Sequence, residues 1–321
     1  MLRTIRIGLF NPAFWSTKAA ATYDRDANLV RLEISMAQSF YKFSPGTYCY
    51  LMVLHDRTWW QSHPFTIASV KSSKKRAAAT ETLGEESDEQ GPLLQPRASF
   101  ELADAAADGG ALRDDQDKAI ILVRPYDQFT GRLRDLASEK SGVPATLRVV
   151  VEGPYGQTRP LGRFDKVLFL TGGSGIAIPL SYLEMLFKKG SRSIVSSVGI
   201  HWAVREAAFA AKTVSEDMEE YLRDERFSVV TYTSAATYRA DNDILAEMEA
   251  MSEKVEARRE RLDCAERIAE AVQSMEVDGK RNLAVVCCGP AVMADDCRAA
   301  VAREVRAGRG RIEYFEESYN W

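Results

Sequence analysis

The chain of 321 residues is 45% apolar and 27% charged, and its formal net charge at pH 7 is −4. A chain of this length exceeds one ordinary hydrophobic core and suits two domains. It contains no apolar run near the roughly 20 residues that a membrane-spanning helix needs and no signal-peptide pattern at its start, so the sequence predicts a soluble protein.

The first part of the chain reads as short strands. They are alternating or wholly apolar, and Pro, Gly and Asn or Asp residues that favour turns separate them. A tight turn at Ser44-Pro45-Gly46 precedes the third strand, and a short helix from about Gly131 separates the last two. Several short strands with one helix predict a small antiparallel barrel. The strands are expected at Thr4–Phe10, Leu29–Ser35, Thr47–Leu54, Ala119–Arg124 and Thr146–Glu152.

Residues 71–118 interrupt this pattern. The segment is rich in Ala, Ser, Gly, Asp and Glu and has no apolar period, which predicts a largely disordered surface insertion. It holds seven basic and eleven acidic residues, a net charge of −4 that equals the formal charge of the whole chain. The rest of the chain is therefore near neutral, and no nucleic-acid partner is expected.

From Lys166 onward strands and helices alternate, which predicts a parallel, doubly wound sheet. Its first unit is the apolar run Val167–Leu170, a glycine-rich turn over residues 171–175, and a helix with apolar residues at helical spacing. Such a turn is either an ordinary tight connection or a place where backbone N–H groups approach a pyrophosphate. Residues 240–280, rich in Ala, Glu and Arg, are expected to form a solvated face or an inserted helix pair. Further strands are expected at Ser193–Ile200, Phe227–Tyr232 and Leu283–Cys287.

The five cysteines are odd in number and lack the paired spacing of metal ligands. This predicts free thiols in a reducing compartment, with no metal site. Cys287 and Cys288 are adjacent on an expected strand, so their side chains should point to opposite faces, with Cys287 toward the core.

Five motifs, in this order along the chain, resemble the cytosolic dehydrogenase region of the ferric reductase and NADPH oxidase superfamily, which is itself similar to ferredoxin-NADP reductases. The likeness spans nearly the whole chain except residues 71–118 and 240–280. The terminal Trp321 and the lead-in Trp59-Trp60-Gln61-Ser62 look more like the fungal metalloreductases than the oxidases. The motifs are His63-Pro64-Phe65-Thr66, Glu152-Gly153-Pro154-Tyr155-Gly156, Gly172-Gly173-Ser174-Gly175-Ile176-Ala177, Cys288-Gly289-Pro290 with Met293, and the aromatic end of the chain.

The resemblance implies an FAD site at His63, Pro64, Phe65 and Thr66. Phe65 would pack on the isoalloxazine, and the Thr66 hydroxyl would reach its N5. His63 stands where ferredoxin reductases have an arginine that pairs with the FAD pyrophosphate, and a mostly neutral imidazole predicts a weaker contact. The alternative for His63 is a hydrogen-bonded core histidine.

A second FAD element is implied at Arg124–Gly131, where a strand leads into a helix whose N-terminus faces the diphosphate. Arg124 is the expected phosphate partner, Thr130 the expected N-cap, and Gly131 opens the helix. The alternative is a surface cap with a solvated arginine. Glu152–Gly156 is the expected domain hinge, with Tyr155 packing either on FAD or only on the second domain.

The resemblance also implies an NADPH site in the second domain. Arg205 follows the second strand there, where an acidic residue favours NADH and an arginine suits the 2′-phosphate of NADPH. The alternative for Arg205 is pairing with Glu206 or another surface acid. The pyrophosphate would lie on the turn residues Thr171, Gly172, Gly173, Ser174, Gly175 and Ile176.

Two further residues are implied at the reacting end of the nicotinamide. Cys288, followed by Gly289 and Pro290, would lie beside the nicotinamide carbon that gives up hydride, where it would orient the ring without reacting covalently. Trp321 would lie over the isoalloxazine face that the nicotinamide must reach, so it would have to move aside.

Together these observations predict a two-domain fold like that of ferredoxin-NADP reductases. An antiparallel FAD-binding β-barrel is expected over residues 1–160, and an α/β, Rossmann-like NADPH domain over residues 161–321.

The expected function is that of an NADPH-dependent oxidoreductase of the ferric-chelate reductase type. NADPH would pass hydride to FAD, with Thr66, Cys288 and Trp321 as the catalytic candidates. Single electrons would then reach a haem in a transmembrane domain absent from this chain, for ferric or cupric ion reduction, which places the module at the cytosolic face of a membrane. The alternatives are the dehydrogenase domain of a superoxide-producing NADPH oxidase, a freestanding flavoreductase, and a non-catalytic scaffold in which the insertion docks a partner.

Overall fold

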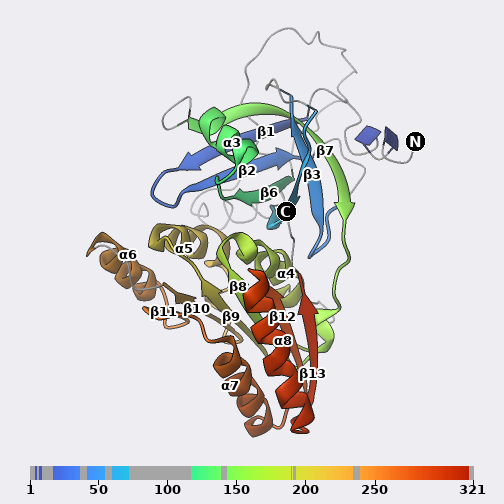
Figure 1. Ribbon diagram of the computed structural model, residues 1–321, viewed down its shortest axis with the longest axis vertical. Helices are drawn as coiled ribbons and strands as arrows, with labels where there is room; N and C mark the ends of the chain where they lie inside the picture. Colours follow the sequence, from blue (N-terminus) through green and yellow to red (C-terminus); the bar gives the residue numbers. More distant parts are fainter. Residues whose placement is uncertain are drawn as a thin grey trace, which may run out of the picture.

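The computed structural model describes residues 17–36, 42–54, 60–71, 117–138, 143–188, 190, 193–233 and 239–317, together with 4, 5, 7 and 8. In these ranges the chain forms an antiparallel sheet and a parallel sheet, and Figure 1 shows β7 leading from the first to the second. The antiparallel sheet has the order β4-β3-β7-β1-β2-β6-β5. Its elements are β1 (Lys18–Asp24), β2 (Leu29–Ser35), β3 (Tyr48–Val53), β4 (His63–Thr66), β5 (Ser69–Lys71), β6 (Lys118–Val123), α3 (Gln128–Ser138) and β7 (Ala145–Tyr155).

The antiparallel sheet curls until its two ends meet. β4 and β5 stand at opposite ends of the strand order, yet only residues 67 and 68 separate them in the chain. Within this link the Ile67 N–H donates to the Thr47 carbonyl at 3.1 Å, beside β3, and the Ala68 N–H donates to the Ile120 carbonyl of β6 at 2.9 Å. Consecutive N–H groups thus bridge the two ends, and the predicted barrel is confirmed.

Helix α3 packs on the barrel through one face. Phe129, Leu133, Leu136 and Ala137 are buried, at the three- and four-residue spacing of an amphipathic helix. They join the inward-facing residues of β1, β2, β3, β6 and β7 in one core. This packing holds the start of the helix next to the end of β6.

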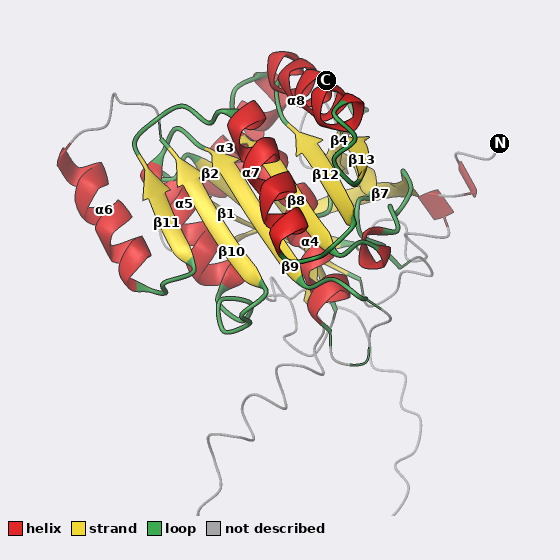
Figure 2. Cartoon of the chain, turned by 90° about the horizontal axis from the view of Figure 1, so that it is seen from below, coloured by secondary structure: helices red, strands yellow, loops and turns green. Residues whose placement is uncertain are grey.

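The second sheet is parallel throughout, with the order β11-β10-β9-β8-β12-β13. Helices cover both faces, and Figure 2 shows α7 in front of the strands and α5 behind them. Side chains that alternate along β8 divide between two cores: Phe169 packs with α4 and α5, and Leu170 with α7 and α8. The doubly wound prediction is confirmed. The elements are β8 (Lys166–Gly172), α4 (Ala177–Phe187), β9 (Ser197–Ala203), α5 (Ala207–Thr213), β10 (Phe227–Tyr232), α6 (Arg239–Ala250), β11 (Val255–Arg258), α7 (Cys264–Val277), β12 (Asn282–Cys288), α8 (Ala291–Arg306) and β13 (Arg311–Glu316).

Two sequence predictions need correction, and one strand of the barrel is missing from them. The strand expected over Thr4–Phe10 is wrong where the chain is described, because residues 4, 5, 7 and 8 are helical. β1 was not predicted, since its inward positions are Ala19 and Ala21, whose small side chains leave no strong apolar alternation. The charged segment 240–280 is not only helical: β11 lies between α6 and α7 and extends the sheet. Residues 72–116, nearly all of the expected insertion, lie outside the described residues.

None of the helices in the described ranges has the length and apolar character needed to cross a membrane.

The barrel and the parallel sheet share an interface. Barrel residues Ala27, Leu29 and Leu122 belong to the same buried cluster as α4, α5 and one face of the parallel sheet. Ion pairs surround this apolar contact. Arg31 on β2 donates two hydrogen bonds to the Asp217 carboxylate, at 2.8 and 2.7 Å, with side chains 8% and 4% exposed.

Further polar contacts join the barrel to the parallel-sheet half. Lys212 of α5 donates to Asp24 of β1 at 2.6 Å, and the Gly46 N–H of the barrel donates to the Ser181 hydroxyl of α4 at 3.0 Å. Polar groups of the two halves therefore satisfy one another, and their relative placement is specified by directional contacts as well as by apolar burial.

Asp217→Asn tests this interface. The substitution leaves the buried Arg31 guanidinium with only the more distant carboxylates of Glu216 at 3.5 Å and Glu33 at 3.7 Å. Removing one partner of a buried ion pair is costly, so the free energy of unfolding should fall by about 3 kcal/mol in urea denaturation. The matched control is Glu216→Gln, whose side chain is 42% exposed and which should cost less than about 1 kcal/mol. Equal effects of the two variants would contradict the assigned role of the Arg31–Asp217 pair.

Candidate functional site

A cavity of about 1030 Å³ lies between the two sheets. The barrel contributes β4 and the end of β6 with the loop into α3. The parallel sheet contributes the turn after β8 and the carboxyl ends of β9 and β12. Ligands of open α/β sheets bind at the carboxyl ends of the strands, so the cavity stands where the fold favours a site.

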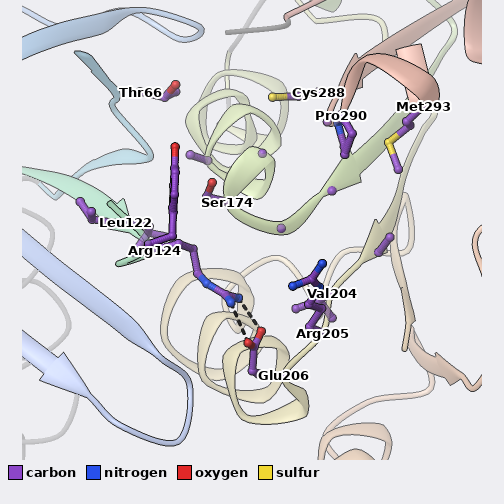
Figure 3. Close-up of a pocket in the computed structure, with 18 of the residues that line it drawn as sticks. Thr66, Leu122, Arg124, Ser174, Val204, Arg205, Glu206, Cys288, Pro290 and Met293 are labelled. Atoms are coloured by element: carbon purple, nitrogen blue, oxygen red, sulfur yellow. Dashed lines mark hydrogen bonds and ion pairs between the residues drawn. The ribbon is translucent and has the colours of Figure 1, made fainter. Parts of the chain in front are cut away.

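The whole of β4 lines this cavity, as predicted for His63, Pro64, Phe65 and Thr66. All four residues are partly buried. The His63 ring stacks on Phe129 of α3, with centroids 4.0 Å apart and planes 19° apart. In Figure 3, Thr66 and Cys288 lie on opposite sides of the cavity, one from each sheet.

The start of α3 is capped differently from the sequence prediction. The helix begins at Gln128, and the Asp127 carboxylate caps it by accepting from the Thr130 N–H at 2.6 Å. The Thr130 hydroxyl accepts in turn from the Asp127 N–H at 3.1 Å, so Thr130 as N-cap is wrong. Burial opposes ionisation of Asp127, but hydrogen bonds from Thr130 and the nearby His63 lower its pKa below the usual value. Thr130 lines the cavity, whereas Gly131 and Tyr155 do not.

Arg124, the expected phosphate partner, is bound to a carboxylate of the other half of the chain. Its guanidinium donates to both carboxylate oxygens of Glu206, at 2.5 and 2.7 Å, from the barrel to the parallel-sheet half (Figure 3). It also lies over the Phe209 ring, 5.5 Å from the centroid. The solvated arginine considered from the sequence is wrong, and a bound phosphate would have to compete with Glu206 for this side chain.

The glycine-rich turn approaches the cavity with its backbone. Gly172, Gly173, Ser174 and Gly175 line the cavity, whereas the predicted Thr171 and Ile176 are fully buried and do not. Gly173 has a φ of +55°, and a Cβ there would meet nothing within 4 Å, so open space stands beside this backbone. At Gly175 a Cβ would lie 2.3 Å from the Cys288 carbonyl oxygen, so only glycine permits this contact between the turn and β12.

A buried tryptophan supports this turn. The Trp202 indole N–H donates to the Gly173 carbonyl at 2.9 Å, and Trp202 is 0% exposed. Its ring meets Phe209 of α5 edge to face, with centroids 5.0 Å apart. Because Trp202 binds the Gly173 carbonyl, the protein itself stabilises the left-handed conformation of Gly173, and no ligand is needed for it.

The two adjacent cysteines of β12 face opposite ways, as predicted. Cys288 lines the cavity and belongs to the core under α4, whereas Cys287 packs in the core under α7 and α8. Burial raises the pKa of Cys288 to about 12, so it is a thiol at neutral pH. Gly289 and Pro290 line the cavity beside it. All five cysteines of the chain are free and buried.

Arg205 is exposed at the end of β9 and lines the cavity, while its neighbour Glu206 is held by Arg124. Several lining residues carried no signal that sequence reasoning used: Tyr126, 78% exposed at the start of α3, and Glu260 and Arg261 after β11. The last two reach the site only because the unpredicted strand β11 brings them there. Trp321 lies outside the described residues, so its stacking remains a prediction.

Comparisons with known proteins match both halves of the chain. A family model described as "FAD-binding domain" matches residues 14–84, and one described as "Ferric reductase NAD binding domain" matches residues 164–302. The first contains β4, and the second contains the glycine-rich turn and Cys288.

Two relatives come from Saccharomyces cerevisiae. Ferric reductase transmembrane component 6 is 27% identical over 292 residues, covering 86% of this chain and 33% of that protein. Component 5 is 26% identical over 338 residues, covering 100% of this chain and 40% of that protein. The chain therefore spans between a third and two fifths of the length of these curated relatives.

Among solved structures, the flavohem-like FAD/NAD binding domain of nitric oxide dioxygenase from Vibrio cholerae is 10% identical with a TM-score of 0.49. The match covers 94% of this chain and 99% of that chain. Similarity at this level supports no statement about function.

Trp202→Phe tests the support of the turn. The variant keeps an aromatic ring but loses the N–H that holds the Gly173 carbonyl, so the affinity for a nicotinamide dinucleotide should fall by about tenfold, the value of one hydrogen bond. FAD affinity should stay unchanged. The control Phe209→Leu loses the ring contact but keeps the indole donor, and it should lower thermal stability without this loss of affinity. Unchanged dinucleotide binding by Trp202→Phe in calorimetry would show that the turn holds its shape alone.

Proposed function

We propose that this chain, which matches the ferric reductase family in both halves, is the NADPH-dependent dehydrogenase module of a membrane metalloreductase. The family models make it an oxidoreductase that binds FAD and a nicotinamide nucleotide. The observation that carries the proposal is the cavity itself, in which β4 of the matched FAD-binding domain faces Cys288 and the glycine-rich turn of the matched NAD-binding domain. A flavin bound there would supply the exchange between a two-electron hydride donor and a one-electron acceptor.

The described residues fit FAD on the barrel side. β4 offers a partly buried apolar and aromatic wall in Pro64 and Phe65, with the Thr66 hydroxyl beside them. The start of α3 borders the cavity next to His63, and its N–H groups suit a diphosphate once the capping Asp127 carboxylate releases them. We therefore assign the isoalloxazine to Phe65 and Thr66 and the diphosphate to the region of His63 and Thr130, with Arg124 beside it but paired with Glu206.

The nicotinamide nucleotide fits the other wall. Open space beside the Gly173 backbone and the N-terminus of α4 suit a pyrophosphate. Cys288, uncharged at neutral pH, would position the nicotinamide opposite Thr66 and help exclude water. Arg205 favours NADPH, because Glu206, which could otherwise bind the ribose of NADH, is occupied by Arg124. Trp321 would cover the flavin face until the nicotinamide displaces it.

The proposed division is an FAD domain over residues 1–160, interrupted at 71–118, and an NADPH domain over residues 161–321, with 240–280 as an insertion. The two yeast relatives are named transmembrane components, and the chain spans 40% or less of their length. From these names together with the motif resemblance, we infer that the electron acceptor is a haem in a membrane domain, that the final acceptor is a ferric or cupric ion, and that the module sits at the cytosolic face of the membrane.

Flavin spectroscopy tests the proposed function directly. Titration with the purified chain should shift the visible absorbance band of FAD and quench its fluorescence. Anaerobic NADPH should then bleach the absorbance of the bound flavin. Ferricyanide reduction should depend on both added FAD and NADPH. A chain that leaves FAD absorbance and fluorescence unchanged at every protein concentration contradicts the proposal.

Thr66→Val tests the hydroxyl assigned to the flavin. Valine keeps the β-branched volume on β4 but cannot donate a hydrogen bond, so flavin reduction in stopped flow should slow by about tenfold while FAD affinity stays within about twofold. The control is Thr22→Val, an exposed position on β1 away from the cavity, which should match the parent. An unchanged reduction rate in Thr66→Val removes this hydroxyl from the mechanism.

A further inference from the structure

Part of the segment 240–280, for which the sequence predicts a solvated face or an inserted helix pair, contributes to the cavity. β11 adds an edge strand beside β10, and the loop that follows it brings Glu260 and Arg261 into the cavity lining. Arg259, between them and β11, is exposed but does not line the cavity. The loop therefore meets the cavity at residues 260–262 and not at residue 259.

The strand register brings Arg261 to the same sheet edge as Arg205. Ala203 on β9, Tyr232 on β10 and Arg258 on β11 lie abreast. Arg205 follows Ala203 by two residues and Arg261 follows Arg258 by three, so both lie at the carboxyl edge of the sheet. Two strand spacings, about 10 Å, separate β9 from β11. Tyr232 also lines the cavity and lies on the strand between them.

The charges at this edge are unevenly compensated. Arg205 and Arg261 are both exposed, and no carboxylate of the described ranges pairs with either. The two neighbouring carboxylates are engaged by other arginines: Glu206 by Arg124 at 2.5 Å, and Glu260 by Arg258 at 3.6 Å. Glu260 shares Arg258 with Glu256, which is nearer at 2.7 Å, so its contact is the weaker of the two. Two guanidinium groups therefore face the cavity edge with Glu206 bound elsewhere and Glu260 only partly compensated.

We propose that Arg261 is a second guanidinium for the 2′-phosphate of NADPH, across Tyr232 from Arg205, and thereby a specificity-determining residue. The inference rests on the proposed NADPH-dependent function and deepens it. A planar guanidinium binds a phosphate through paired N–H donors, and two of them match its two negative charges. The 2′-hydroxyl of NADH is uncharged and can accept only a single neutral hydrogen bond, so Arg261 adds much more affinity for the phosphorylated nucleotide.

Calorimetric binding of adenosine 2′,5′-bisphosphate and of 5′-AMP to the full chain tests the inference without any turnover. In Arg261→Ala the bisphosphate should bind about ten- to a hundredfold more weakly, the range for one charge-assisted contact, while 5′-AMP stays within about twofold. Arg205→Ala should show a similar loss, and the double variant should bind both nucleotides almost equally. Arg261→Lys should recover part of the affinity, and the neighbouring control Arg259→Ala should match the parent.

The outcomes separate this inference from the proposed function. If Arg261→Ala binds the bisphosphate like the parent while Arg205→Ala binds it weakly, Arg261 takes no part and the NADPH preference stands. If Arg261→Ala weakens both nucleotides equally, the residue supports the adenosine site or the fold, and the inference is wrong. If the parent does not distinguish the bisphosphate from 5′-AMP, the chain has no 2′-phosphate site and the NADPH assignment fails with the inference.

Discussion

The cavity depends on the packing of the barrel against the α4–α5 face of the parallel sheet. Leu29 and Leu122 of the barrel share one buried cluster with that face, so part of the apolar core belongs to both halves. The Arg31–Asp217 pair, buried at the edge of this cluster, adds a directional contact that apolar packing lacks. Separation of the halves would expose this shared core and leave a buried guanidinium unpaired. The two walls of the site are therefore held in register by the fold itself.

The Arg124–Glu206 pair at this interface removes a free carboxylate from the end of β9. Glu206 comes from the end of β9, where a free carboxylate would repel a phosphate and favour a ribose hydroxyl. Arg124 comes from the barrel, so the docking of one half sets the charge that the other presents. The charge at this edge is thus a property of the assembled chain, and under the proposed NADPH assignment its positive part would come from Arg205 and Arg261.

The opposite end of the nucleotide site is organised by close packing. Gly175 touches the Cys288 carbonyl where any side chain would clash, and Trp202 holds the Gly173 carbonyl from within the core. The turn, the end of β12 and the start of α4 consequently form one rigid corner. A backbone held in this way can meet a ligand without first losing conformational freedom, which favours binding.

The sequence alone was sufficient for what local pattern and motif determine. The glycine turn after Val167–Leu170, the strand at Leu29–Ser35 and the opposite faces of Cys287 and Cys288 follow from short-range spacing, and His63–Thr66 and Cys288 do line one cavity. Only the tertiary structure decided that Asp127 caps α3, that Arg124 binds Glu206, and that β11 carries Arg261 into the site. These features join residues of different strands or domains. Glu206, for example, pairs with Arg124 of the barrel and not with its sequence neighbour Arg205. Such pairing depends on the distance between side chains in the folded chain, which sequence spacing does not encode.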